Sequence, residues 1–182
     1  MYYLDLARMY EPKPCKVANP DKSLLGLTVP IITEHTTEAE AQNKGRATRE
    51  EIYQFIISDL KSAEKYLAKA SEKYTTPGLC AVYGLLARTY LELGATYSDP
   101  TFSVNQTPSP EVWEMTSEKA YAEAAKYARK VINTGRFSPL TQYEWENPQT
   151  GFNDGTSNNA WIWGLTVSAE NVSNLIAHVA HR

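Results

Sequence analysis

The sequence predicts a mainly α fold: tetratricopeptide-like helical hairpins with long irregular loop insertions and little or no sheet. Three observations predict it. Apolar residues recur at helical spacing in four segments, two of these segments share a motif, and proline-containing stretches without regular spacing separate them. The chain has 182 residues, 42% of them hydrophobic and 21% charged, which suits one globular domain or a large piece of one.

The first two helices are predicted from the spacing of their apolar residues. Residues 1–10 carry apolar side chains at positions i, i+3, i+4 and i+7. The second predicted helix covers residues 49–70. It begins with a capping box, in which the side chain of Thr48 caps the helix and Glu51 reaches back.

The next two helices are bounded by proline and glycine. The third is predicted to start with Thr76 as its N-cap and Pro77 at the first helical position, and to end at Gly94. The fourth covers 116–135, and it closes with an Asn-Thr-Gly sequence whose glycine can end a helix.

Long irregular stretches lie between and after these helices. Residues 11–47 and 95–115 contain several prolines, and loops of this length inside a compact domain tend to be functional. Residues 151–159 form a loop rich in Gly, Asn and Asp, and 161–167 are rich in strand-forming residues.

These boundaries divide the chain into two parts of one domain. Residues 1–140 hold two helix pairs, at 1–70 and 77–135. Residues 141–182 hold a loop and a short strand or helix segment. The first helix has no capping residue ahead of it, and the last segment has no helix-ending Gly or Pro, so we expect a fragment of a longer chain.

An internal repeat relates the two helix pairs. The first helices of the pairs share a motif, which reads Tyr3-x-x-Leu6-Ala7-Arg8-x-Tyr10 and Tyr83-x-x-Leu86-Ala87-Arg88-x-Tyr90. The second helices share a spacing, that of Tyr53, Ile56, Leu60 and Ala63 and of Tyr121, Ala124, Ala128 and Val131. Paired helices with these residue types are typical of tetratricopeptide repeats, although the connections here are far longer than usual. The alternative is two unrelated amphipathic hairpins.

Charge and cysteine content exclude several classes of protein. The net charge is −3 and no basic stripe exists, so we expect no nucleic-acid partner. The apolar runs are far shorter than the roughly 20 residues of a membrane-spanning helix. Asp5 and Arg8 interrupt the apolar residues of the first segment, so it lacks the uninterrupted apolar stretch of a secretory signal.

We expect Cys15 and Cys80 to be unpaired thiols, with a disulfide between them as the alternative.

Motifs for catalysis or metal binding are lacking. The sequence contains no GxSxG, Walker, GxGxxG or HExxH motif. Carboxylate pairs such as Glu50 and Glu51 lie in polar stretches, where nothing would shift a pKa for acid–base catalysis. His178 and His181 are three residues apart, but neither a cysteine nor a paired carboxylate joins them. We therefore expect no enzyme activity, no cofactor and no metal.

Five segments, in order along the chain, carry a further pattern. They are YYLDLARMY at 2–10, LTVPIIT at 27–33, RATREEIY with ISDL at 46–60, AVYGLLARTYL at 81–91, and YAEAAKYA with VINTG at 121–135. Together they resemble motifs of the SusD/RagB family of surface glycan-binding lipoproteins, over about residues 1–140.

The resemblance implies a function. A SusD-like protein captures oligosaccharide or polysaccharide for nutrient uptake, without catalysis, at the external face of the Gram-negative outer membrane. Its partner is a SusC-like TonB-dependent transporter. The resemblance implies membrane attachment only through a lipid anchor, and this chain lacks the lipoprotein signal and the lipid-attached cysteine. It is also shorter than a full member of the family.

Two other functions remain open at this point. One is a tetratricopeptide scaffold whose concave groove binds peptides. The other is a fragment of a glycoside hydrolase, which would need two carboxyl groups in one cleft.

Candidate glycan-binding residues lie in the predicted loops. Glycan binding needs flat aromatic faces with amide or carboxylate groups at the rim. The residues that fit are Tyr97, Phe102, Trp113, Tyr143, Trp145, Asn147, Asn153 and Asp154. The densest group surrounds Trp145 and Asn147. The alternative for Trp113 and Trp145 is that each ring fastens its loop onto the helices.

Overall fold

A computed structural model describes residues 2–11, 24–70, 73, 75–98, 113–147 and 159–164. In these ranges the chain forms helices and two isolated β-bridges, with no sheet. The helices are α1 (Tyr2–Tyr10), α2 (Glu38–Gln42), α3 (Arg49–Tyr66), α4 (Leu79–Ser98), α5 (Ser117–Ile132) and α6 (Gln142–Glu146). The predicted mainly α fold is therefore confirmed. The tetratricopeptide interpretation and the division at residue 140 stay predictions.

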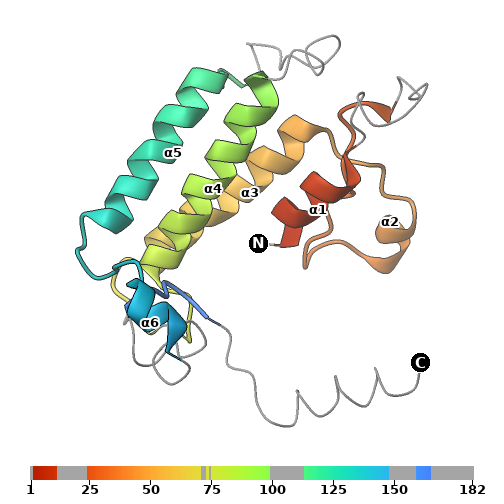
Figure 1. Ribbon diagram of the computed structural model, residues 1–182. Coiled ribbons are helices and arrows are strands. Elements are labelled where there is room, and N and C mark those ends of the chain that lie inside the picture. Colours follow the sequence, from red (N-terminus) through yellow and green to blue (C-terminus); the bar gives the residue numbers. More distant parts are fainter. Residues whose placement is uncertain are drawn as a thin grey trace, which may run out of the picture.

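Four helices form a row in which consecutive helices run in opposite directions. Figure 1 shows the order α1, α3, α4, α5 across the molecule, and α4 packs against both α3 and α5. The short α2 lies in the connection from α1 to α3, and α6 lies at the end of the row where α5 finishes. None of the described helices combines the length and hydrophobicity that a membrane crossing needs.

The capping box predicts the start of α3 correctly. Thr48 Oγ accepts a hydrogen bond from the Glu51 backbone N–H at 3.2 Å, and Glu51 Oε2 accepts one from the Thr48 N–H at 2.7 Å. The helix ends at Tyr66, four residues before the predicted end. The prediction of helix α1 is also confirmed.

The same Thr-x-x-Glu pattern starts two short helices that the sequence analysis missed. Thr37 and Glu40 form a capping box at α2, and Thr141 and Glu144 form one at α6. Each box gives a hydrogen-bond acceptor to two backbone N–H groups, those of the threonine and the glutamate, at the helix start. Both helices have only five residues, too short to show an apolar period.

The predicted limits of α4 are wrong at both ends. The helix begins at Leu79, after Pro77, and continues through Gly94 to Ser98. Gly94 is buried inside the helix, where a Cβ atom would lie 2.9 Å from the ring of Tyr121 on α5. This glycine therefore permits a close helix–helix contact and does not end the helix.

The predicted start and end of α5 agree with the structure. Thr116 Oγ accepts a hydrogen bond from the Lys119 N–H at 3.2 Å and caps the helix. The helical residues end at Ile132, and Gly135 follows with a φ of 64°. Because this φ lies in the left-handed region, glycine is favoured at the turn that leaves the helix.

The core is built around α4, whose Leu86, Tyr90 and Leu93 are almost fully buried. The partners from the other helices are Leu4, Ala7, Ile52, Tyr53, Ile56, Leu60, Ala120, Ala124 and Tyr127. Burial of a large apolar side chain contributes about 1.5–3 kcal/mol relative to exposure. The row of helices is thus held mainly by apolar contact along α4.

The two repeat copies agree in their first tyrosine. The ring of Tyr3 meets Phe55 of α3 edge-on, with 5.3 Å between centroids, and the ring of Tyr83 meets Tyr127 of α5 at 5.9 Å. Each tyrosine therefore contacts an aromatic ring on the second helix of its own pair.

The two repeat copies differ in how far their other corresponding tyrosines are buried. Tyr10 is 52% exposed whereas Tyr90 is 2% exposed, and Tyr121 is 39% exposed whereas Tyr53 is 2% exposed. In the described part of the chain, α1 and α5 form the two edges of the row; α5 packs on α4, and α1 packs on α3 and also forms ion pairs with α4. The correspondence of Tyr53 with Tyr121 thus holds in spacing but not in burial.

Ion pairs link helices that are distant in the sequence. Arg8 Nε lies 3.1 Å from Glu92 Oε2, and an Arg88 nitrogen lies 3.8 Å from Asp5 Oδ1, so two pairs connect α1 to α4. A third pair, between Arg49 and Glu11, is buried and connects the start of α3 to the end of α1. These pairs set the register of α1 on the row.

The long connection between α1 and α3 is tied down at defined points. The Tyr3 hydroxyl donates to the Ile32 carbonyl at 2.7 Å and accepts from the Ile32 N–H at 2.8 Å. Arg46 Nε donates to the Thr28 carbonyl at 2.7 Å. The LTVPIIT segment is therefore held against α1 and the start of α3.

Beyond residue 147 the chain is described only at 159–164, where it is irregular. The Ser138 N–H donates to the Asn159 carbonyl at 3.2 Å. The other residues of the predicted strand-forming run, 165–167, lie outside the described residues, as do Cys15, His178 and His181.

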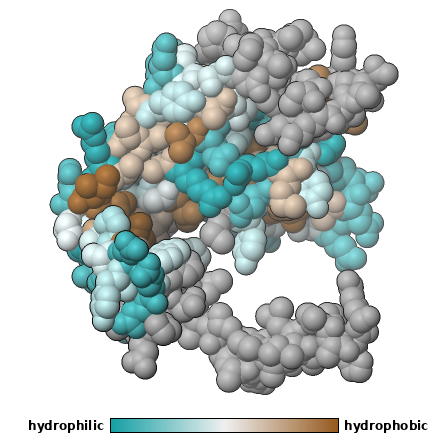
Figure 2. Space-filling view, viewed as in Figure 1, coloured by the Kyte–Doolittle hydropathy of each residue, from teal (hydrophilic) through white to brown (hydrophobic). Residues whose placement is uncertain are grey.

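On the side of the molecule shown in Figure 2, most of the described surface is hydrophilic or of intermediate hydropathy. Figure 2 shows hydrophobic side chains gathering where α5 ends beside α6. Ile132, the last residue of α5, is 72% exposed there. This apolar area lies at the end of the row.

We expect Gly94→Ala to lower the free energy of unfolding relative to Gly84→Ala by about 2 kcal/mol, because the new methyl group meets the Tyr121 ring. Gly84 has no atom within 4 Å of the equivalent position and lies in the same helix, so it is the matched control. Urea denaturation of both variants checks the difference. Equal stabilities would show that the Tyr121 ring moves aside without cost.

We expect Arg49→Met to lower the free energy of unfolding by about 3 kcal/mol, because Glu11 would keep a buried charge without its partner. Replacing both residues, with Arg49→Met and Glu11→Leu, should restore most of that loss. Guanidinium denaturation of the single and double variants tests the pair. A single variant as stable as the original protein would contradict it.

Candidate functional site

The structure brings two of the candidate residues together. Tyr97 lies in the last turn of α4, and Trp113 precedes the cap of α5. Their ring centroids are 6.3 Å apart and the ring planes meet at 68°, an edge-to-face contact. Both residues are half-buried. The long connection between α4 and α5 thus starts and returns at a pair of packed rings.

The other described candidates lie at the opposite end of α4. Tyr143 and Trp145 are on α6, and Asn147 is its C-cap. Helix α4 has 20 residues, which corresponds to about 30 Å, so this group and the Tyr97–Trp113 pair are separate places.

The α6 group does not form a single aromatic platform. Tyr143 is 76% exposed and Trp145 is 58% exposed, but they are two residues apart on one helix. Side chains at i and i+2 do not share a face of a helix. Phe102, Asn153 and Asp154 lie outside the described residues, so the predicted cluster around Trp145 is described only at these α6 residues.

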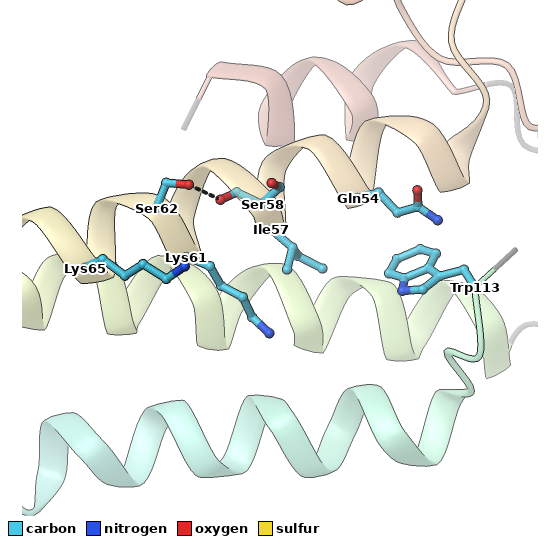
Figure 3. A pocket seen from close by; sticks show the side chains of 7 residues that line it. All are labelled: Gln54, Ile57, Ser58, Lys61, Ser62, Lys65 and Trp113. Atoms are coloured by element: carbon cyan, nitrogen blue, oxygen red, sulfur yellow. Dashed lines mark hydrogen bonds between the residues drawn. The ribbon is translucent and has the colours of Figure 1, made fainter.

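A groove of about 370 Å³ lies between α3 and Trp113. Its size falls within the range of about 300–1,000 Å³ for small-ligand sites. Figure 3 shows the Trp113 ring beside Gln54 and Ile57, with the other lining side chains following along α3. The lining residues are Gln54, Ile57, Ser58, Lys61, Ser62, Lys65 and Trp113.

The lining combines an indole ring with several hydrogen-bonding groups. Gln54 offers both an amide donor and an acceptor, and the lysines offer donors. The Ser62 hydroxyl donates to the Ser58 carbonyl at 3.0 Å and keeps its oxygen as an acceptor. The described lining residues include no carboxylate. This set can hold a ligand that has an apolar ring face and polar edges.

A buried polar pair lies near the Trp113 end of α3. Burial, followed by the charge of Glu50, raises the pKa of Tyr97, and burial also raises the pKa of Glu50. Within the described residues, the Tyr97 hydroxyl and one carboxyl oxygen of Glu50 are buried without a hydrogen bond. Glu50 precedes Gln54 by one helical turn, so this pair borders the groove.

A second groove, of about 310 Å³, lies where α3 ends and α4 begins. Its lining includes Leu67, Leu79 and Tyr83, with Arg136 at one side. Cys80 is part of this lining, and burial raises the pKa of its thiol. The thiol is therefore protonated at neutral pH, and the groove is lined largely by apolar groups.

An ionic cluster lies between the two grooves on α3 and α5. Lys130 Nζ is 2.7 Å from Glu64 Oε1 and lies 4.5 Å from the centroid of Tyr83 and 4.6 Å from that of Tyr127. Burial raises the pKa of Glu64, but the hydrogen bond and charge of Lys130 outweigh it and lower the pKa. Glu64 is thus a charged, paired group that joins α3 to α5.

Sequence analysis missed the α3 side of the first groove. Gln54, Ser58, Lys61 and Lys65 repeat at helical spacing, but on a helix such a polar stripe usually faces solvent. The described residues contain no set of three His, Cys, Asp or Glu side chains placed to hold a metal ion. The one feature of the sequence that could have indicated this side of the groove is the polar stripe itself, which lies beside the predicted buried stripe of the same helix.

Three comparisons with known proteins give the following results. Half of the chain, residues 1–91 of 182, matches the model of a SusD-like family described as "Starch-binding associating with outer membrane". No curated protein matches the chain. The fold is similar to the crystal structure of a SusD-like carbohydrate binding protein from Bacteroides vulgatus, with a TM-score of 0.61 and 22% sequence identity. The match covers 93% of this chain but only 28% of that chain.

We expect Glu50→Gln to raise the free energy of unfolding at pH 7. Because the pKa of Glu50 is raised in the folded state, the folded protein binds more protons than the unfolded one, and stability falls as pH rises through that window. The gain should shrink as the pH approaches the ordinary glutamate pKa of about 4.3. Thermal denaturation between pH 4 and pH 8, with the exposed Glu34→Gln as control, checks this. A variant that is less stable at pH 7 would refute it.

Proposed function

The chain belongs to the SusD-like family, and from this premise we propose that its protein binds oligosaccharide or polysaccharide without catalysis. We further propose that it does so at the external face of the outer membrane and passes the glycan to a SusC-like TonB-dependent transporter. The family description, which joins starch binding to outer-membrane association, supports the location.

The groove beside Trp113 is the observation that carries the proposal for this chain. The apolar face of a sugar ring packs on a flat aromatic ring, and its hydroxyls need donors and acceptors around the edge. Trp113 supplies the ring, Gln54 supplies an amide beside it, and Ser58 supplies a polar group one helical turn further along α3. A sugar stacked on Trp113 would thus find hydrogen-bonding partners on α3.

The packing behind Trp113 supports its role as a platform. Tyr97 meets the indole edge-on and belongs to α4, the most buried helix of the row. A ring that is already held in place loses little conformational entropy when a ligand binds. Trp113 can therefore both fasten the α4–α5 connection onto the helices and bind a sugar ring.

The lining of the groove accords with binding without hydrolysis. Glycoside hydrolases use a pair of carboxyl groups on either side of the scissile bond. The lining residues that the structure describes have none, and Glu50, which borders the groove, is a single half-buried carboxyl. No described feature specifically favours a peptide ligand, which remains an outcome of the experiment below.

We expect Trp113→Ala to weaken glycan binding by at least about tenfold, as loss of a buried aromatic anchor does. Trp145→Ala on α6 removes an equally large but exposed ring at the other end of the row, and it should leave binding unchanged. Calorimetry against a panel of neutral and acidic polysaccharides measures both variants. Equal losses in the two variants, or binding of peptides with no response to any sugar, would contradict the proposal.

A further inference from the structure

The groove beside Trp113 differs in charge from the rest of the chain. The whole chain has a net charge of −3, with 21 acidic and 18 basic residues. Among the described residues that line the groove, in contrast, Lys61 and Lys65 are basic and none is acidic. The described part of the groove thus combines two basic groups with an aromatic platform, and the half-buried Glu50 borders it.

Two carboxylates, one on α3 and one on α5, are each paired with a lysine of α5. Glu64 of α3 is 2.7 Å from Lys130 Nζ, and Glu123 of α5 is 2.8 Å from Lys126 Nζ. In the part of the chain that the structure describes, no carboxylate lies within ion-pair distance of Lys61 or Lys65. Lys61 only adds a small electrostatic contribution to the lowered pKa of Glu64. Among the described residues, therefore, neither groove lysine is held in an ion pair.

The two lysines lie in line with the indole ring. Figure 3 shows Ile57, Lys61 and Lys65 following one another along α3 from the place where Trp113 packs. At 1.5 Å per residue, Lys61 lies about 6 Å and Lys65 about 12 Å beyond Ile57. A ligand that stacks on Trp113 and follows α3 therefore passes Lys61 first and Lys65 one helical turn later.

We propose that this groove selects an acidic oligosaccharide, with one sugar ring on Trp113 and anionic groups at Lys61 and Lys65. The inference rests on the proposed glycan-binding function and adds the class of glycan. The anionic groups are uronate carboxylates or sulfate esters, since an ammonium group forms strong charge-assisted hydrogen bonds with either. Binding of this kind weakens as salt screens the charges.

The test compares polymers that differ only in charge. Calorimetry on the full chain uses polygalacturonate and its methyl ester as one pair, and dextran sulfate and dextran as the other. We expect the charged member of at least one pair to bind more tightly, and its affinity to fall as salt is raised. The pair that responds distinguishes carboxylate from sulfate.

Matched lysine variants locate the effect. The double variant Lys61→Gln/Lys65→Gln should lose about tenfold in affinity for the charged polymer at low salt. The double variant Lys44→Gln/Lys73→Gln removes the same charge from exposed positions outside the groove and should keep full affinity. All four lysines are exposed, so both variants should fold normally.

The outcomes separate this inference from the proposed function. Equal binding of charged and uncharged polymers, or equal losses in the two double variants, overturns the acidic-glycan inference but leaves glycan binding standing. If none of the polymers in either pair binds and a wider panel of neutral glycans also fails, the proposed function falls and this inference falls with it.

Discussion

The burial of α4 between two neighbouring helices is the constraint on which the rest of the structure depends. Leu86 and Leu93 are fully buried, and the ring of Tyr90 stacks on Tyr127 with centroids 5.9 Å apart and planes at 7°. Since α4 contacts α3 on one side and α5 on the other, its position fixes both. It also fixes Tyr97 in its last turn, which holds Trp113 against α3. The packing of α4 in the core therefore also positions Trp113, and with it the groove at the surface.

Polar contacts set the register of helices that apolar packing alone would leave loose. The buried pair of Arg49 and Glu11 joins the start of α3 to the end of α1, and such pairs specify an arrangement more than they add stability. The Tyr3 hydroxyl then holds the returning chain at Ile32. These contacts let a long connection leave and re-enter the row at fixed points. A scaffold of this kind can carry long insertions without loosening its core.

The sequence predicted the main helices because their apolar stripes and caps are local signals, as at Thr48 with Glu51. It misplaced the end of α4 because Gly94 is needed for the approach of Tyr121, a contact that no local pattern reveals. The site was predicted in part: Tyr97 and Trp113 were both named, but their contact crosses a long connection, and the α3 stripe that completes the groove looks like an ordinary solvent-facing surface. Contacts that form only through tertiary packing, such as these, produce no local sequence pattern from which they could be predicted.

The most direct test of the account is an NMR titration of the tryptophan indole N–H signals with an acidic oligosaccharide such as oligogalacturonate. The chain has four tryptophans, of which Trp113 lines the groove and Trp145 is exposed on α6. The account predicts that the Trp113 signal shifts on addition of the sugar, together with backbone signals of α3 around Gln54 and Lys61. A titration that shifts the Trp145 signal and leaves those of Trp113 and α3 unchanged would contradict it.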